Sequence, residues 1–505
     1  MSTFSGTTTF VQYPVNSLDD IPVITNWTPL IGYMVHCDDI TGVFYFKLIL
    51  EVRADSNTGT LLGKIKQRRN GYSVDVAGDE ARAFFDLKDI VNSYLVDTVN
   101  DQNNAGQPFV TIHKIGDNTS QKPFSASGDR NTDEVQIARI YVKAYQQYSE
   151  SAGEVPSVDD TSTTVNDTLV YTGASLPLFT ERDTSSDYVQ SDAFGSYTVS
   201  GSSGTFLSDN YIGNFNPYTG ATATINKVQW NGTKGDYHTL AFLNDNDMFG
   251  SDVVEIKVKY YNATSGTALS TTTFDNMSSN GGWEPDNSEA TTPADPMESK
   301  YQLLYFGCGP GNLEGQSLSN AHPSDGGNSG WAYYTVQGFN ASGSARTNLV
   351  TFLKDDGSCK GFKVRRLAWR NSLGCYDYFN FKMKSVQTFE VERNNYNTML
   401  GTFNKSRWRY NDTQRGKTTR KTTTTLKETL HTDWLNEEEA GLVEKLIMSS
   451  SVYVVENADT NNTQGVIVND SSFTIKTIAN NKLIQYTINI EYSNAINQAS
   501  LPVFK

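Results

Sequence analysis

Two long segments in the last third of the chain alternate apolar and polar residues, GFKVRRLAW at 361–369 and YDYFNFKMKSVQTFEVER at 376–393. Successive side chains of a β-strand point to opposite faces of its sheet, so this period of two predicts strands. The short RNSLGC between the segments predicts a turn. Two further apolar runs, at 44–53 and 61–68, flank the turn cluster DSNTG and predict a hairpin.

Other strands are predicted at 134–148, where the alternation is imperfect as in a bulged strand, at 253–262 and at 301–309. The chain has 27 Tyr and 25 Phe, and its intervening segments are crowded with Thr, Ser, Asn and Gly. This balance favours strands joined by long loops. We therefore predict a mainly β, multidomain fold, with β-sandwich-like N-terminal and central domains and a C-terminal α+β domain.

Two helices are predicted. Residues 84–95, FFDLKDIVNSYL, place Phe85, Ile90, Val91 and Leu95 at roughly helical spacing. The second helix is predicted over 437–449, where Asn436 is a cap residue and Glu439, three positions later, completes a capping box. Its apolar residues line one face, which is typical of a helix packed on a sheet. Four strands are predicted after it, including SFTIKTI at 472–478.

A chain of 505 residues is longer than one hydrophobic core usually supports, so several domains are expected. We predict an N-terminal domain over 1–148, a linker over 149–168, a central loop-rich domain over 169–358 and a C-terminal domain over 359–505. The linker is predicted because SESAGEVPSVDDTSTTVNDT has almost no apolar residues with which to build a core.

The net charge of −15 argues against a general role in binding duplex DNA, because attraction to phosphate requires a positive field. Four cysteines lie far apart and form no CxxC pair, so we expect free thiols. The start MSTFSGTTTF lacks the features of a secretory signal, and no segment reaches the length of a membrane span. We expect a protein made in the cytosol without a membrane span.

The segment WRNSLGCYDYF at 369–379 joins a glycine turn to four aromatic residues. With the preceding strand it resembles a recurrent sequence, W-x-N-x-L-G-x-Y-D-x-F-x-F, of structural proteins of tailed bacteriophages, often from tail or baseplate regions. The Trp-led helix and strand WLNEEEAGLVEKLIMSSSVYVV at 434–455 add to the resemblance. Together with the N-terminal hairpin and FDLKDIVNSYL at 85–95, the resemblance touches both ends of the chain and leaves residues 168–300 largely uncovered. In the alternative interpretation, Trp369, Tyr378 and Phe379 are simply core residues around a turn, which is compatible with the first.

The resemblance implies a non-enzymatic virion protein, made in the bacterial cytoplasm, that assembles with copies of itself and with other virion proteins. It implies a symmetric oligomer in the tail, baseplate, neck or fibre-attachment region. It brings no catalytic, cofactor-binding or metal-binding residue.

Basic residues gather between 405 and 427, with aromatic residues among them. We predict that this segment contacts another protein, because the chain as a whole is acidic and a basic segment then suits an acidic neighbour better than it suits DNA. The segment KTTRKTTTTL within it alternates like an edge strand protected by its charges. The predicted contact residues are Lys405, Arg407, Trp408, Arg409, Arg415, Lys417, Arg420 and Lys421.

The glycine-rich segment GCGPGNLEG at 307–315 does not match the spacing of a phosphate-binding loop, and no helical pattern follows it. We predict a turn or a subunit-contact loop there. The five histidines lack metal-ligand spacing, no GxSxG motif occurs, and the Asx-rich run at 244–247 lacks the spacing of a calcium loop. Glu284 and Asp286 beside Trp283 leave one alternative open, a carbohydrate-binding adhesin or glycan-active protein that contacts the host surface.

Overall fold

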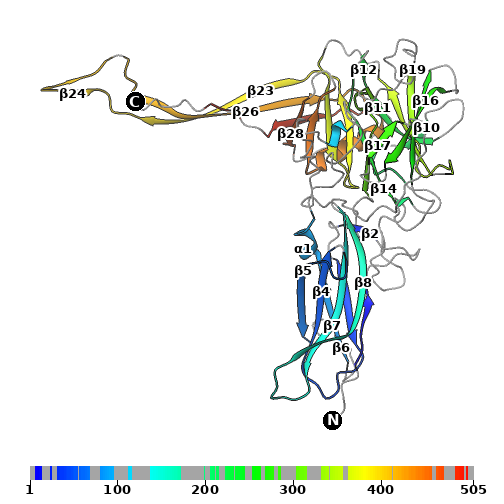
Figure 1. The fold of residues 1–505 in the computed structure, drawn as a ribbon. Coiled ribbons are helices and arrows are strands. Elements are labelled where there is room, and N and C mark those ends of the chain that lie inside the picture. Colours follow the sequence, from blue (N-terminus) through cyan, green and yellow to red (C-terminus); the bar gives the residue numbers. More distant parts are fainter. Residues whose placement is uncertain are drawn as a thin grey trace. The chain divides into compact units, whose positions relative to one another are not determined.

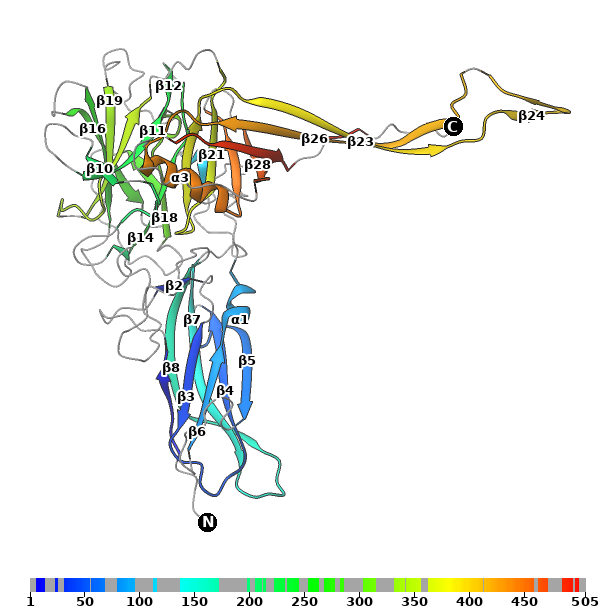
Figure 2. The same ribbon diagram turned by 180° about the vertical axis from the view of Figure 1, so that it is seen from behind.

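The computed structural model divides the chain into two compact units (Figures 1 and 2). Unit 1 comprises Met1–Asp355 and Asn371–Asp377, and unit 2 comprises Asp356–Arg370 and Tyr378–Lys505. The first border lies close to the predicted boundary at 358/359. The structure describes residues 6–13, 23–25, 31–54, 56–68, 80–95, 112–115, 137–171, 198–199, 205–210, 212–214, 222–231, 234–244, 253–262, 268–277, 282–285, 303–314, 331–340, 342–355, 362–411, 413–457, 462–470, 484–493 and 496–498.

The N-terminal part of unit 1 is a sandwich of two sheets with the strand orders β2-β8-β7-β4-β5 and β1-β3-β6. Alternate residues of β4, among them Leu48 and Leu50, share one core with Val35 of β3 and Phe85 of β6. The predicted hairpin is confirmed as the antiparallel pair β4 and β5, and β7 has the predicted bulge. The strands are β1 Thr8–Gln12, β2 Val23–Thr25, β3 Gly32–Cys37, β4 Phe44–Ala54, β5 Thr60–Arg68, β6 Ala81–Asp86, β7 Ile137–Ser149 and β8 Ser157–Tyr171.

The helix predicted over 84–95 is wrong in its first part. Residues up to Asp86 complete β6, and helix α1 spans only Lys88–Asn92, followed later by the 3-10 turn η1 Ile112–Lys114. Phe85 and Val91 both reach the core, the first from a strand and the second from the helix. Over so short a segment, apolar spacing alone does not distinguish the two.

The linker predicted over 149–168 is also wrong, because most of it is the fifteen-residue strand β8. β8 pairs antiparallel with β7 from Ser157 to Tyr171, whereas β2 pairs only with its last three residues. A strand that has one neighbour among the described residues along most of its length is held by backbone hydrogen bonds and can be polar, and Val158 and Val165 are indeed exposed. Scarcity of apolar residues here indicates a solvated strand.

The central part of unit 1 has its own core, to which two sheets contribute side chains. The strand orders of these sheets are β10-β11-β20-β19-β15-β16-β17 and β18-β14-β9, and β12 and β13 form a separate pair. Aromatic rings fill it, and Tyr334 stacks on Phe352 with centroids 4.8 Å apart. The strands are β9 Thr198–Val199, β10 Ile212–Asn214, β11 Thr222–Val228, β12 Trp230–Asn231, β13 Lys234–Gly235, β14 Thr239–Asn244, β15 Glu255–Asn262, β16 Ala268–Met277, β17 Gly282–Pro285, β18 Leu303–Gly307, β19 Trp331–Phe339 and β20 Val350–Lys354.

The glycine-rich segment after β18 is a buried turn, so the subunit-contact alternative for it is wrong. It leads into a short helix, α2 Pro310–Glu314, where no helix was predicted. A side chain at Gly309 would collide with backbone atoms of Asp236 and His238, and one at Gly311 would collide with the carbonyl oxygen of Gly235. These glycines therefore permit two backbone segments to approach closely.

Unit 2 is an eight-stranded sheet ordered β22-β21-β27-β28-β29-β26-β23, with β30 added to β26. The predicted helix is confirmed as α3 Glu437–Met448, and Figure 2 shows it beside this sheet. Its capping box is present: Glu439 N–H donates to Asn436 Oδ1 (2.7 Å), and Asn436 N–H donates to Glu439 Oε2 (3.3 Å). The strands are β21 Arg365–Arg370, β22 Tyr376–Phe381, β23 Val386–Asn397, β24 Thr402–Asn404, β25 Arg407–Arg409, β26 Lys417–His431, β27 Val452–Val455, β28 Thr463–Val468, β29 Thr487–Tyr492 and β30 Ile496–Gln498.

The turn predicted between β21 and β22 is present, and its segment Asn371–Asp377 belongs to unit 1. The Asn371 side chain accepts the backbone N–H groups of Leu373 and Cys375, and Gly374 takes a φ of +83° that favours glycine. Trp369 before the turn is fully buried, as the core interpretation of this motif predicts. The predicted strand at 472–478 lies outside the described residues.

Three of the four cysteines, Cys37, Cys308 and Cys375, are free and buried, and Cys359 lies outside the described residues. Burial raises the pKa of the Cys37 thiol to about 11, so little reactive thiolate exists at neutral pH. We expect a thiol reagent such as Ellman's to react slowly with these three in native protein and to count four thiols after denaturation without reductant. A denatured count of two or none would contradict this.

Candidate interaction site

The predicted contact residues lie on a long hairpin of unit 2, here called the arm and defined as Val386–His431. Its two long strands, β23 and β26, pair antiparallel, with Val386 opposite Thr429 at one end and Asn397 opposite Lys417 at the other. β24 and β25 form a smaller hairpin at the end of the arm. Figure 1 shows the arm continuing beyond the rest of the unit 2 sheet. All residues of β23 and β25 are exposed.

The structure brings the eight predicted residues onto one element and leaves all eight exposed. Lys405 is in the turn between β24 and β25 with a φ of +58°, and Trp408 lies in β25 between two arginines. Lys417, Arg420 and Lys421 lie at the start of β26, and Arg415 just precedes it. The edge-strand prediction is wrong for the later part of 417–426, since β30 pairs with Thr422–Thr424; the edge strand is β23.

Apart from Trp408, the exposed apolar residues of the arm are the part of this site that sequence reasoning missed. Nine large apolar side chains of the arm are more than a third exposed, and Phe403 is 72% exposed. Scattered exposed apolar residues are ordinary, but such a set on one hairpin makes the hairpin a candidate interaction surface. They are Val386, Phe389, Val391, Tyr396, Met399, Leu400, Phe403, Trp408 and Tyr410.

The end of the arm has a defined local structure. The Trp408 ring meets Phe403 edge to face, with centroids 5.5 Å apart, and packs against Gly401 at a φ of +87°. Gly401 N–H donates to Gln414 Oε1 (2.9 Å), which ties the two sides of the hairpin together. The aromatic and basic side chains at this end are therefore presented by an ordered hairpin.

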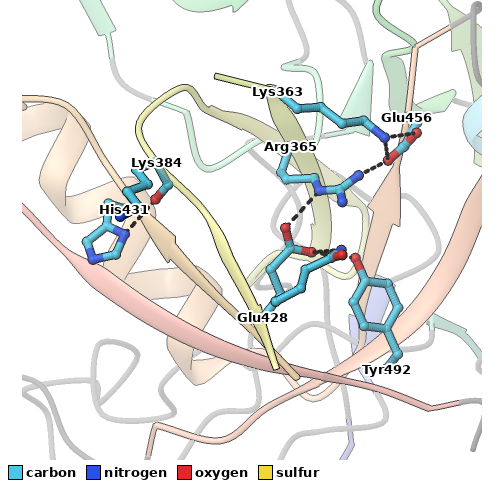
Figure 3. Close-up of polar contacts among 8 residues, drawn as sticks. Lys363, Arg365, Lys384, Glu428, His431, Glu456 and Tyr492 are labelled. Carbon is cyan, nitrogen blue, oxygen red and sulfur yellow. Dashed lines mark hydrogen bonds and ion pairs between the residues drawn. The ribbon is translucent and has the colours of Figure 1, made fainter. Parts of the chain in front are cut away.

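The root of the arm is fixed by a buried ionic network within unit 2 (Figure 3). Glu428 of β26 is buried, and its carboxylate accepts hydrogen bonds from Arg365 Nε (2.9 Å), the Tyr492 hydroxyl (2.7 Å) and Gln387 Nε2 (3.2 Å). Arg365 also pairs with Glu456, which Lys363 contacts at 3.0 Å. At the end of β26, His431 Nδ1 donates to the Lys384 carbonyl oxygen (2.8 Å).

Charge is stabilised at this root. Burial opposes ionisation of Glu428, but the hydrogen bonds from Tyr492, Arg365 and Gln387 outweigh it, so the pKa of Glu428 is lowered. Burial likewise opposes the charge on Arg365, and the carboxylate of Glu428 outweighs it, so the pKa of Arg365 is raised. The network holds both strands of the arm to the sheet and leaves the rest of the hairpin free to contact another molecule.

Among the described residues, no group of three or more His, Cys, Asp or Glu side chains is placed to hold a metal ion. The glycan alternative depended on Trp283, Glu284 and Asp286; the first two lie in β17, and the side chains of all three lie outside what the structure describes. The run 245–247 also lies outside it.

No helix in the described part of the chain is both long and apolar enough to cross a membrane. No protein-family model matches this chain, and its sequence matches no curated protein.

Proposed function

We propose that the chain is a non-enzymatic structural protein of a tailed bacteriophage particle, which assembles into a symmetric oligomer through its arm and contacts neighbouring virion proteins. The observation that carries the proposal is the arm itself, which joins nine exposed apolar side chains to a cluster of cations on a hairpin with a fixed root. Burying those side chains against a partner removes apolar surface from water, which is the main driving force of association.

Charge supports a protein partner over nucleic acid. Between Arg393 and Lys421 the sequence has eight Lys and Arg residues and one acid, Asp412, although the whole chain carries −15. A cationic arm on an acidic chain fits a neighbour that carries the same acidic surface. The large apolar side chains favour a protein contact further, because duplex DNA is bound mainly through its phosphates.

The test replaces Arg415, Lys417, Arg420 and Lys421 by Ser, which removes four exposed charges and keeps the intervening threonines of β26. We expect the variant to fold and to self-associate at least about tenfold more weakly than wild type in sedimentation velocity, and wild-type association to weaken with salt. The matched control exchanges Lys and Arg at the same four positions, which keeps the charge.

Normal assembly of the Ser variant would contradict the proposal. If, in addition, only wild type retained DNA on a filter with a steep dependence on salt, the arm would instead be a phosphate-binding element.

A further inference from the structure

A second exposed surface lies at one end of the N-terminal sandwich, where two turns meet. β4 pairs with β7 antiparallel, and Phe44 at the start of β4 lies opposite Ser149 at the end of β7. The turn before Phe44 and the turn after Ser149 are therefore neighbours at the same end of the sheet. We call this surface the acidic tip and define it as residues 38–45 and 150–160.

The acidic tip presents apolar side chains to solvent. Phe44, Tyr45 and Val158 are each more than two fifths exposed, and Val155 is 90% exposed. Such side chains, close together at the end of two long strands, offer an apolar contact area of the kind found in protein interfaces.

The shape of the acidic tip is set by hydrogen bonds between and within its turns. The Tyr45 hydroxyl donates to the carbonyl oxygen of Ala152 (2.8 Å), which joins the two turns. The Ser149 hydroxyl donates to the Ser151 carbonyl oxygen (2.6 Å), and Gln147 Nε2 donates to that of Pro156 (3.2 Å). Tyr45 takes a φ of +57°, a strained conformation for a non-glycine residue that this network maintains. A partner therefore meets a preformed surface, and little ordering is required on binding.

The charge of the acidic tip is entirely negative. Its 19 positions hold six acids, Asp38, Asp39, Glu150, Glu154, Asp159 and Asp160, and no Lys or Arg. Within the described residues, Glu150, Glu154 and Asp160 form no ion pair, so their charge is available to a partner. Burial raises the pKa of Tyr148 beside the tip, and the charges of Asp159 and Glu150 add to that effect.

The arm matches this surface in both respects. The outer part of the arm, residues 393–421, is cationic and has exposed aromatic side chains. The acidic tip is anionic and has exposed aromatic and aliphatic side chains, so each surface combines apolar area with a charge opposite to that of the other. We propose that the outer part of the arm of one copy docks on the acidic tip of a second copy of this chain. This inference rests on the proposed function, since it names the surface that receives the arm.

The geometry of such an assembly follows from its two unlike surfaces. Each copy gives one arm and receives another, either reciprocally in a two-fold dimer or head-to-tail along a series of copies. A head-to-tail series closes into a ring or continues as an open filament. Both surfaces of every copy are then occupied, apart from the ends of an open assembly.

Charge reversal in two separate variants tests the pairing. The tip variant carries Glu150→Lys, Glu154→Lys and Asp160→Lys, and the arm variant carries Arg415→Glu, Lys417→Glu, Arg420→Glu and Lys421→Glu. The tip variant changes the net charge of the tip from −6 to zero, and the arm variant changes that of residues 393–421 from +7 to −1, so each variant alone loses the attraction between arm and tip. We expect its self-association in sedimentation velocity to weaken at least about tenfold. In an equimolar mixture the unchanged arm of the tip variant meets the unchanged tip of the arm variant, and we expect the two variants to associate with each other.

Association in the mixture also shows that both variants are folded. Neutralising the tip by Glu150→Gln, Glu154→Gln and Asp160→Asn should give a loss of self-association smaller than that of the tip variant. If the tip variant assembles alone as wild type does, the arm docks elsewhere, and this inference fails while the proposed function stands. A mixture that stays monomeric, although each variant has lost assembly, also overturns the pairing. If wild type itself is monomeric at every concentration tested, the proposed function fails as well.

Discussion

Replacing Glu428 by alanine is expected to destabilise unit 2 by about 3–5 kcal/mol, because removing one partner of a buried ion pair leaves the other charge uncompensated. The Glu428 side chain is inaccessible to solvent, and Arg365, its partner at 2.9 Å, is 10% exposed. Without Glu428, the Arg365 guanidinium retains Glu456 as its ionic partner among the described residues, and the Tyr492 hydroxyl and Gln387 amide lose this acceptor.

The measurement is hydrogen–deuterium exchange of peptides from β21 and α3 across a denaturant series, which reports unit 2 separately from the rest of the chain. Glu390→Ala is the matched control, since Glu390 is also on the arm and pairs with Lys427 but is exposed. We expect little change in this control, because water already solvates both charges. Glu428→Gln, which keeps a hydrogen-bond acceptor, should lie between the two. If Glu428→Ala and Glu390→Ala lowered the stability of unit 2 equally, the buried ionic network would not be what anchors the arm.

Local signals explain what the sequence predicted well. Helix α3 follows from a capping box and an apolar face that lie within fourteen consecutive residues, so no distant contact is needed to predict it. The same holds for the β4–β5 hairpin, where a short turn joins two adjacent strands. The basic residues of the arm were likewise visible as a group, because they are close in sequence.

The exposure of the arm was not predictable from alternation. β22 and β23 follow one another and alternate equally well, yet Tyr378 and Phe381 of β22 are buried and Phe389 of β23 is exposed. Alternation tells which side chains share a face of a strand, but whether another element covers that face depends on tertiary packing. For the same reason, the polar strand β8 resembles a linker in sequence, because its one described neighbour along most of its length supplies backbone hydrogen bonds and few apolar contacts.

Contacts between residues that are far apart in the chain could not be predicted from the sequence either. Asp377 was visible only as part of the turn motif, and its partners Ser208 and Asp209 precede it by 169 and 168 residues. The Asp377 carboxyl group is fully buried in unit 1, where it accepts hydrogen bonds from the Ser208 hydroxyl (2.6 Å), Asp209 N–H (2.9 Å) and Asn371 Nδ2 (3.1 Å). Burial and, secondly, the charge of Asp209 raise the pKa of Asp377 from 3.8 to about 7.

This raised pKa gives the stability of unit 1 a pH dependence of predictable sign. The folded state holds the proton of Asp377 up to about pH 7, whereas the unfolded chain releases it near its ordinary pKa of 3.8. The contribution of Asp377 to stability is therefore full below about pH 4 and declines as pH rises towards 7, by about 1.4 kcal/mol per pH unit. Above about pH 7 both states are ionised, and no further change is expected from this group.

Asp377→Asn should remove this decline, since the amide remains neutral, its oxygen can accept the Asp209 and Asn371 donors, and its NH₂ can donate to the Ser208 hydroxyl. We expect the variant to gain about 3 kcal/mol relative to wild type between pH 5 and pH 8, measured as exchange of peptides from β14 and β18 in denaturant. The other titrating groups are common to both proteins and cancel in the difference. Asp209→Asn is the control: its oxygen can accept the Ser372 N–H, its NH₂ can donate to the Ser372 hydroxyl, and the neighbouring charge is removed, so the decline should shrink without vanishing. Parallel pH profiles for wild type and Asp377→Asn would show that Asp377 is ionised in the folded protein throughout this range.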